Sequence, residues 1–189
     1  MSTNKFFITP ESLRIDSYKL AGLVVKSGFV PDYIVVIWRG GAPVGCYVHE
    51  LMKRVGLNPD HIAIRTARYT GIDKTSSEIQ VFNLGYLLER LKKESKVLLI
   101  DDVYDTGLTI QKIKQTFSEK LGNNCPDDIR TATVYYKPLR NKTAHIPEYY
   151  VKTSDQWLVF PHELEGLSID EISELISPEI GQLVSELTN

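Results

Sequence analysis

Cysteine is scarce in this chain of 189 residues, which contains only Cys46 and Cys125. Two cysteines so far apart exclude a disulfide scaffold and a cysteine zinc site, and indicate free thiols in a reducing compartment. No apolar run approaches the length that crosses a bilayer. The first residues, MSTNKFFITPESL, lack the long apolar stretch of a secretory signal. These absences predict a cytoplasmic protein that does not interact with a membrane.

Positive charge is absent after Lys152. The eight acidic residues beyond that point are Asp155, Glu163, Glu165, Asp170, Glu171, Glu174, Glu179 and Glu186. Residues 1–152 therefore carry all 22 basic residues against 16 acidic ones, a net charge of +6. A mildly basic body suits a polyanionic small molecule. The charge is too weak and too dispersed to predict a nucleic-acid partner.

Helical and extended patterns alternate along the chain. Thr9-Pro10-Glu11 offers an N-cap, with proline in the first turn, for a helix that extends to about Ser27. Further helices are predicted at Val44–Arg54 and from Ile110 onward, and strands at Tyr33–Trp38, His61–Arg65, Lys96–Ile100 and Thr131–Tyr136. The length fits one domain. Strands separated by helices predict an α/β fold with a central, mostly parallel sheet flanked by helices.

Two stretches lie outside this alternation. Tyr69–Ser77 is polar, contains glycine and has no clear period, which predicts a long mobile loop. From Ser168 the chain has a capping-box pattern with Glu171, then apolar residues at spacings of three and four, and a restart at Ser177-Pro178. This acidic, amphipathic tail is expected to be helical and to pack on the body or on a second subunit.

The segment Val97–Ile110, VLLIDDVYDTGLTI, is the most specific signal in the chain. Its four apolar residues predict a strand buried on both faces, and Asp101-Asp102 and Asp105-Thr106-Gly107 are expected in the loop beyond that strand's carboxyl end. The helix that follows then begins beside this loop, an arrangement that holds phosphate-bearing ligands. Because the carboxylates repel a bare phosphate, the ligand also needs sugar hydroxyls or a metal. The segment thus predicts a site for a phosphorylated sugar.

Val97–Ile110 resembles the phosphoribosyl-pyrophosphate (PRPP) motif of the type I phosphoribosyltransferases. The resemblance extends over roughly residues 5–165, through Trp38–Gly41 at the pyrophosphate loop and Tyr69–Val81 at the hood loop. Lys137-Pro138 and Gln156–Leu158 resemble the base-recognition elements of the xanthine-guanine and hypoxanthine enzymes. The implied organisation is a catalytic domain at 1–165, with a small hood whose loop is at about 66–82 and a base-recognition segment at 137–163, followed by the helical tail at 166–189.

Competing phosphate-binding families lack support in the residues. No G-x-x-x-x-G-K-[ST] loop is present, and Gly40-Gly41 lacks the third glycine of a dinucleotide fingerprint. A PRPP-synthesising enzyme shares the acidic motif but, by the same resemblance, needs a far longer chain.

The resemblance implies a PRPP site. Backbone N–H groups of Asp105–Thr109, Leu108 included, are expected to bind the 5′-phosphate, with hydroxyls from Thr106 and Thr109 and close approach at Gly107. Simple helix capping by Asp105 or Thr106 is the alternative. Asp101 and Asp102 are expected beside the ribose hydroxyls and Mg²⁺. Neighbours on a strand face opposite sides, so one of the two carboxylates is free to pair with a nearby Lys or Arg instead.

The other end of PRPP is assigned to Arg39, Gly40 and Gly41, which are expected to hold the pyrophosphate. The resemblance implies a cis Trp38–Arg39 peptide, and a tight strand-to-helix turn is the alternative. Arg68 and Tyr69 are expected to close over the site and exclude water.

On the base side, the position of Asp105 is Asp in relatives that use 6-oxopurines and typically Ala in adenine-specific ones. Asp105 is therefore expected to act as the catalytic group that takes or shares the N7 proton. Lys137 fits the O6 carbonyl, Trp157 would stack on the purine, and Leu158 would contact its edge. For Trp157 the alternative is a core aromatic.

Three further features lie near the predicted site: Glu163, His162 and the segment that follows Lys137. Glu163 falls where relatives hold a second magnesium. His162 is expected to be a partly exposed loop residue without a role. The segment PLRNKTAHIP after Lys137 can add base-side contacts.

The function implied is purine salvage: PRPP and hypoxanthine, guanine or xanthine give a nucleoside 5′-monophosphate and pyrophosphate, with Mg²⁺. A homodimer or homotetramer is expected. The alternatives are a regulatory protein of the same fold that senses PRPP or nucleotides, and a phosphoribosyltransferase for another base.

Overall fold

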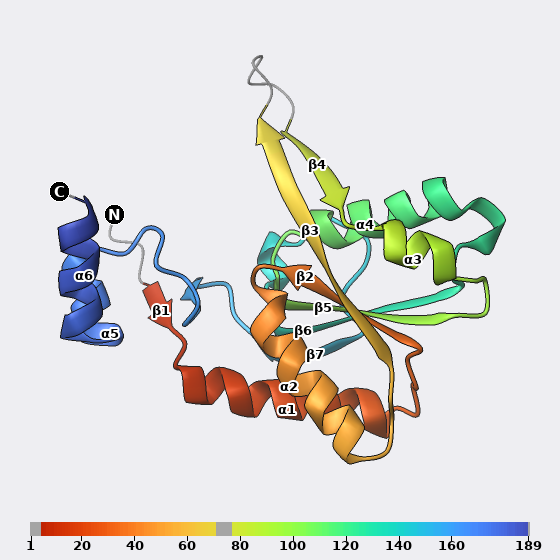
Figure 1. Ribbon diagram of the computed structural model, residues 1–189, viewed down its shortest axis with the longest axis horizontal. Coiled ribbons are helices and arrows are strands. Elements are labelled where there is room, and N and C mark those ends of the chain that lie inside the picture. The colour runs from red at the N-terminus through yellow and green to blue at the C-terminus, as the bar shows by residue number, and fades with distance from the viewer. Residues whose placement is uncertain (1–4, 71–76, 189) are drawn as a thin grey trace.

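The computed structural model describes residues 5–70 and 77–188, and gives only the backbone of residues 68–70, 77 and 78. In these ranges six strands form the main sheet, in the order β4-β3-β2-β5-β6-β7 (Figure 1). Their bounds are β2 Tyr33–Trp38, β3 Asp60–Thr70, β4 Ser77–Phe82, β5 Lys96–Tyr104, β6 Asp128–Tyr136 and β7 Tyr149–Thr153. Every neighbouring pair is parallel except β3 and β4. The predicted α/β fold with a mostly parallel sheet is confirmed.

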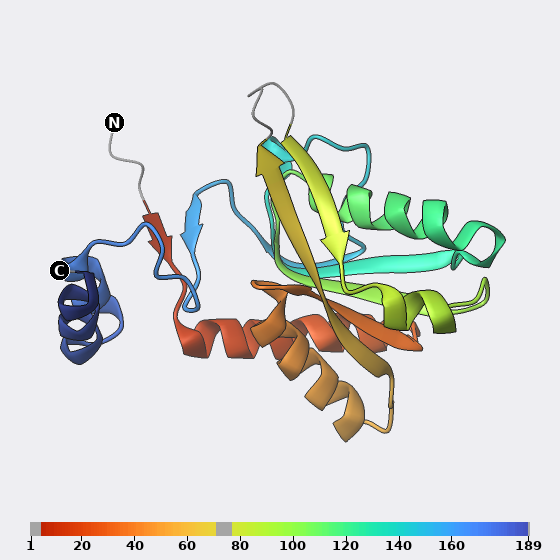
Figure 2. The ribbon, with the colours of Figure 1, turned by 45° about the horizontal axis from the view of Figure 1, so that its top comes forward.

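Helices cover both faces of this sheet (Figure 2). They are α1 Pro10–Lys26 and α2 Gly41–Arg54 on one face, and α3 Gly85–Arg90 and α4 Leu108–Leu121 on the other, with short turns η1 Gly122–Asn124 and η2 Pro138–Arg140. Leu98 belongs to the apolar cluster under α1 and α2, whereas Leu99 belongs to the cluster under α3 and α4. Successive strand residues face opposite sides. The apolar run of β5 is therefore buried on both faces, as predicted.

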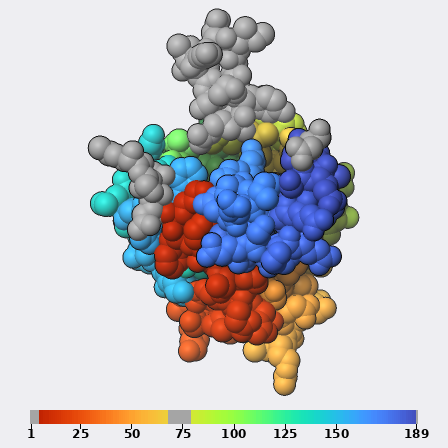
Figure 3. Space-filling model, turned by 90° about the vertical axis from the view of Figure 1, so that its left-hand side faces the viewer, coloured from red at the N-terminus to blue at the C-terminus, as the bar shows by residue number. Residues whose placement is uncertain are grey.

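A second, two-stranded sheet pairs the first described strand with the strand that precedes the tail, and is called the hood below. Strand β1 (Lys5–Phe7) pairs in parallel with β8 (Trp157–Val159). The tail helices α5 (Ile169–Leu175) and α6 (Pro178–Thr188) lie beside this pair at one end of the molecule (Figures 1 and 3). The predicted capping box is present at the start of α5, and α6 begins at the predicted restart.

Two predicted strand ends are wrong. β5 does not stop at Ile100 but continues to Tyr104, because Asp101 pairs with Thr133 and Tyr104 with Tyr136 of β6. The acidic pair therefore lies within the strand rather than in the loop beyond it.

β3 likewise runs past Arg65 to Thr70, because β4 pairs with it in antiparallel register. Most of the predicted loop Tyr69–Ser77 then falls at 71–76, outside the described residues. None of the described helices is both long and apolar enough to cross a bilayer.

Candidate functional site

The candidate site lies where the strand order reverses. β2 leads through α2 to β3 on one side, and β5 leads through α4 to β6 on the other, although β2 and β5 are neighbours. In open α/β sheets the crevice outside the carboxyl ends of strands at such a point binds ligands. The segments that follow these strands begin at Arg39, Asp105 and Lys137, which are all predicted site residues.

The acidic pair at the end of β5 packs against the loop after β2. A Cβ atom at Gly40 would overlap the Asp102 carboxylate, and one at Gly41 would overlap the backbone of Ile100. Only glycine permits this approach. Burial and the neighbouring Asp102 carboxylate raise the pKa of Asp101, although amide hydrogen bonds from Asp102 and Gly41 oppose the shift. A buried carboxylate beside another favours a cation close by.

The partner of Asp102 is His162. The distance between His162 Nε2 and Asp102 Oδ2 is 3.1 Å, and the two side chains are 16% and 8% exposed. The imidazole stacks on Phe160, with ring centroids 5.5 Å apart, and its Nδ1 is buried with no hydrogen-bond partner among the described residues. His162 is thus a partly exposed loop residue, as the sequence predicted, but it contacts Asp102, a pairing that the sequence did not predict. No Lys or Arg of the described residues forms an ion pair with Asp102, which was the alternative that the sequence left open.

The loop Asp105–Gly107 carries the features of a phosphate site. Gly107 has a φ of 76° and is the N-cap of α4, where no side chain caps the helix and no acidic residue lies in the first turn. Helix capping by Asp105 or Thr106 is thus not observed. Amide groups at an uncapped helix start favour an anion.

A cavity of about 210 Å³ opens at this loop. It is lined by Asp101, Val103, Tyr104, Asp105, Thr106, Gly107, Thr109, Ile110 and Arg140. Arg140, which the sequence analysis did not single out, donates from Nε to Asp105 Oδ1 at 2.5 Å. The cavity therefore brings together five of the residues predicted to bind PRPP and adds a cation to them.

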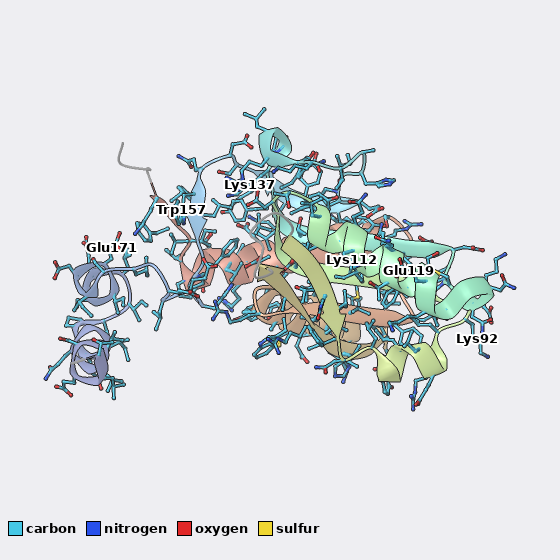
Figure 4. The ribbon with its side chains drawn as sticks, turned by 90° about the horizontal axis from the view of Figure 1, so that it is seen from above. Lys92, Lys112, Glu119, Lys137, Trp157 and Glu171 are labelled. Atoms are coloured by element: carbon cyan, nitrogen blue, oxygen red, sulfur yellow. The ribbon has the colours of Figure 1, made fainter. Side chains whose placement is uncertain are left out.

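Lys137 and Trp157 lie on either side of the junction between the main sheet and the hood (Figure 4). Lys137 is only 7% exposed, and its Nζ donates to the carbonyl oxygen of Gln156 at 2.8 Å. Its own backbone N–H donates to Tyr104 O at 2.9 Å, which places it beside the start of the phosphate loop. Trp157 is 55% exposed whereas Leu158 is buried. The core-aromatic alternative for Trp157 is therefore wrong.

The loop after β2 contains a cis peptide between Trp38 and Arg39. Arg39 is exposed, and its guanidinium lies 4.0 Å from Glu165. It lines a second cavity, of about 180 Å³, together with Lys5, Trp157, Leu158, Val159, Glu163, Glu165, Gly166 and Leu167. Arg39, predicted for the pyrophosphate, thus shares one cavity with Trp157 and Leu158, which are predicted for the base, whereas Gly40, Gly41 and Lys137 do not line it. The predicted roles of Arg68 and Tyr69 rest on side chains outside the described part of the structure.

The predicted metal ligands divide into two groups. No three His, Cys, Asp or Glu side chains in the described residues are arranged to hold a metal ion, so Glu163 does not join Asp101 and Asp102 in one cluster. Glu163 Oε2 instead accepts from the backbone N–H of Phe160 at 3.0 Å. The adjacent pair alone still suits magnesium, which binds proteins through one or two carboxylates and takes its other ligands from substrate phosphates and water.

Comparison with known proteins gives consistent results. Residues 14–168 match the family model described as the phosphoribosyl transferase domain. A hypoxanthine-guanine phosphoribosyltransferase from Staphylococcus epidermidis is 28% identical over 144 residues, which cover 75% of this chain and 73% of that protein.

Two solved structures are similar in fold. A purine phosphoribosyltransferase from Pyrococcus horikoshii Ot3 has a TM-score of 0.66 at 23% identity, covering 86% of this chain and 97% of that one. A hypothetical protein from Neisseria gonorrhoeae with bound ppGpp has a TM-score of 0.71 at 21% identity, covering 95% and 99%.

Proposed function

This chain belongs to the phosphoribosyl transferase domain family, and we propose that it transfers the 5-phosphoribosyl group of PRPP to a 6-oxopurine, with release of pyrophosphate. The observation that carries the choice of base is the ammonium group of Lys137. It is buried, and Gln156 O is its one acceptor among the described residues. An ammonium group has three donors, so two remain for a ligand. A purine O6 carbonyl accepts such bonds, whereas the exocyclic amine of adenine does not.

Asp105 supplies the second base contact. Asp105 lines the phosphate cavity, and it follows the same edge of the sheet as Lys137. In the proposed reaction a ring nitrogen of the base displaces pyrophosphate from the anomeric carbon, and the N7 proton of the base moves to or is shared with Asp105. Trp157 would stack on the ring, since it is exposed at the hood, and the backbone of Leu158 would contact the edge of the base.

Asp101 and Asp102 are assigned to the ribose hydroxyls and to Mg²⁺. When bound, the metal neutralises charge that develops on the leaving pyrophosphate. Arg39 and the amides around Gly40 and Gly41 are assigned to the pyrophosphate itself. Arg68 and Tyr69, at the end of β3, are assigned to close over the site and exclude the water that hydrolyses PRPP. We further propose that the protein acts in the cytoplasm. We also propose a homodimer or homotetramer, and size-exclusion chromatography with light scattering tests this oligomeric state.

The decisive experiment offers PRPP and Mg²⁺ with hypoxanthine, guanine, xanthine, adenine, uracil or orotate and follows pyrophosphate release. We expect turnover with at least one 6-oxopurine and none with adenine. Lys137→Met should raise the KM for the base about tenfold or more, because O6 loses a charge-assisted donor, and should leave the KM for PRPP within a few fold.

The alternatives predict different outcomes in the same assay. Turnover with uracil or orotate alone would indicate a phosphoribosyltransferase whose substrate is a pyrimidine base. Tight binding of PRPP without turnover of any base would favour a regulatory protein that senses PRPP or nucleotides. Either result overturns the proposed activity.

A further inference from the structure

The phosphate cavity is lined by negatively charged side chains, although the ligand proposed to occupy it is itself negatively charged. Its lining includes the carboxylates of Asp101 and Asp105, while a 5′-phosphate brings up to two further negative charges. Amide groups and the helix dipole offset part of this repulsion. Among the described residues that line the cavity, Arg140 supplies the only cationic side chain.

Arg140 is held at the cavity by its own backbone. It ends the short turn η2, whose Leu139 N–H donates to Asp155 Oδ1 at 3.0 Å and whose Arg140 N–H donates to Lys137 O at 3.2 Å. Two residues later, the N–H of Lys142 donates to Thr106 O at 3.0 Å. The N–H of Lys137 donates to Tyr104 O, so backbone contacts at Lys137 and at Lys142 hold this segment against the end of β5 and the phosphate loop, with Arg140 between them.

The contact at Asp105 leaves most of the guanidinium available. Only Nε donates to Asp105, and the side chain of Arg140 is 56% exposed. A guanidinium carries five N–H donors in a planar fork, and the terminal nitrogens match two phosphate oxygens at once. One arginine can therefore hold Asp105 through Nε and a phosphate through its terminal nitrogens.

We propose that Arg140 binds the 5′-phosphate of PRPP and of the nucleotide product, and that through Nε it holds the Asp105 carboxylate in place at the base. The inference rests on the proposed function, since it takes the ligand to be a ribose 5-phosphate group. Arg140 is then a binding residue toward the phosphate and a positioning residue toward Asp105. Binding of the 5′-phosphate would therefore fix the position of the Asp105 carboxylate, which accepts the proton of the base in the proposed reaction.

Calorimetric titration of ribose 5-phosphate and, separately, of pyrophosphate with Mg²⁺ tests the phosphate contact without turnover. We expect Arg140→Gln to weaken ribose 5-phosphate about 10- to 100-fold, as for the loss of charge-assisted hydrogen bonds, and to change pyrophosphate less than twofold. Arg140→Lys keeps the charge but not the fork and should recover only part of the affinity. Unchanged affinity of Arg140→Gln for ribose 5-phosphate would overturn the proposal.

Lys142→Gln is the matched control. It removes the same charge from an exposed residue on the same segment that does not line the cavity. Equal weakening in this variant would reduce the effect to general electrostatics and would also overturn the proposal.

Steady-state kinetics test the positioning role. At saturating PRPP, Arg140→Gln should lower kcat as well as raise the KM for PRPP, and an unchanged kcat would overturn the link to Asp105.

The proposed activity and the proposed role of Arg140 can fail separately. If wild-type protein binds ribose 5-phosphate through Arg140 but turns over no base, only the proposed activity fails. If it turns over a purine while Arg140→Gln binds ribose 5-phosphate normally, only this inference fails.

Discussion

At the residue scale, neighbouring positions of β5 differ in environment. Asp101 lines the phosphate cavity, and burial and Asp102 raise its pKa. Asp102 lies against Gly40 and pairs with His162. Because the two side chains face opposite sides of the strand, a carboxylate doublet that looks uniform in the sequence provides one group toward the cavity and another toward the loop after β2.

Asp105→Asn should abolish most turnover. The amide cannot accept the N7 proton, and general acid–base groups typically contribute 10²- to 10⁴-fold. We therefore expect kcat to fall within that range while the KM for PRPP stays within a few fold. Pyrophosphate release under steady-state conditions measures both, and a near wild-type rate would remove Asp105 from its assigned role.

His162→Ala should destabilise the fold and weaken PRPP binding. It leaves the buried Asp102 carboxylate without a partner, and a hydrogen bond to a charged group contributes about 1.5–3 kcal/mol. We expect the free energy of unfolding in urea to fall by about that amount and the KM for PRPP to rise. His162→Gln keeps an N–H donor and should restore part of both.

His145→Gln provides the control for both measurements, because His145 is exposed and the histidine that contacts Asp102 is His162. If His162→Ala unfolds normally and binds PRPP normally, the contact with Asp102 has no positioning role.

At the element scale, the contact between the hood and the tail depends on Lys5 of β1 and Glu171 of α5, next to Ser168, the N-cap of that helix. Lys5 Nζ lies 2.8 Å from Glu171, which also accepts from the backbone N–H of Ser168 in the capping box. The hydrogen bond from Lys5 lowers the pKa of Glu171 most, and the hydrogen bond from the Ser168 amide lowers it further. The stabilisation is therefore present above the ordinary carboxylate range and is lost as the pH falls through this lowered pKa.

Ser168→Ala and Glu171→Gln should separate these two contributions. Ser168→Ala removes the cap, which typically costs about 1 kcal/mol of helix stability. Glu171→Gln keeps a capping side chain but loses the ion pair. We expect Ser168→Ala to speed amide hydrogen exchange throughout α5, and Glu171→Gln to speed it in β1 and at the start of α5. Exchange in β5 serves as the internal reference, and equal acceleration there would contradict a local role.

At the scale of the whole molecule, the proposed ligand spans both sheets. The phosphate cavity belongs to the main sheet, whereas the cavity of Arg39 also includes Trp157 of the hood and Lys5 of β1. A ligand that fills both would bind only the folded chain with its hood in place. Its binding should therefore raise the stability of the chain as one unit.

PRPP with Mg²⁺ should raise the melting temperature markedly. At a ligand concentration of about 100 times Kd, the linkage amounts to about 2.7 kcal/mol, which for a chain of this size corresponds to roughly 5–11 °C. Differential scanning calorimetry should show this shift for wild type, a small one in EDTA, and a small one for Asp101→Asn. An equal shift with and without the metal would contradict the assignment of Mg²⁺ to the acidic pair.

Contiguous patterns determined much of this protein. The apolar run, the acidic doublet and Asp105–Gly107 predicted a strand, a phosphate loop and a helix, because periodicity and turn chemistry are properties of neighbouring residues. The resemblance of these residues to a known motif indicated the family, which the domain match confirms, and implied the roles of Lys137 and Trp157. The roles of individual site residues stay predictions.

Only the tertiary structure decided the contacts between distant segments. β5 extends through its acidic pair because β6 continues beside it, and the hood exists because β1 pairs with β8. The pairs His162–Asp102 and Arg140–Asp105 join residues 60 and 35 positions apart. Such contacts depend on the register of the strands and on where their connections end, which no local pattern encodes. The sequence by itself thus determined the family and which side chains follow the edge of the sheet, and the fold decided which distant side chains contact them.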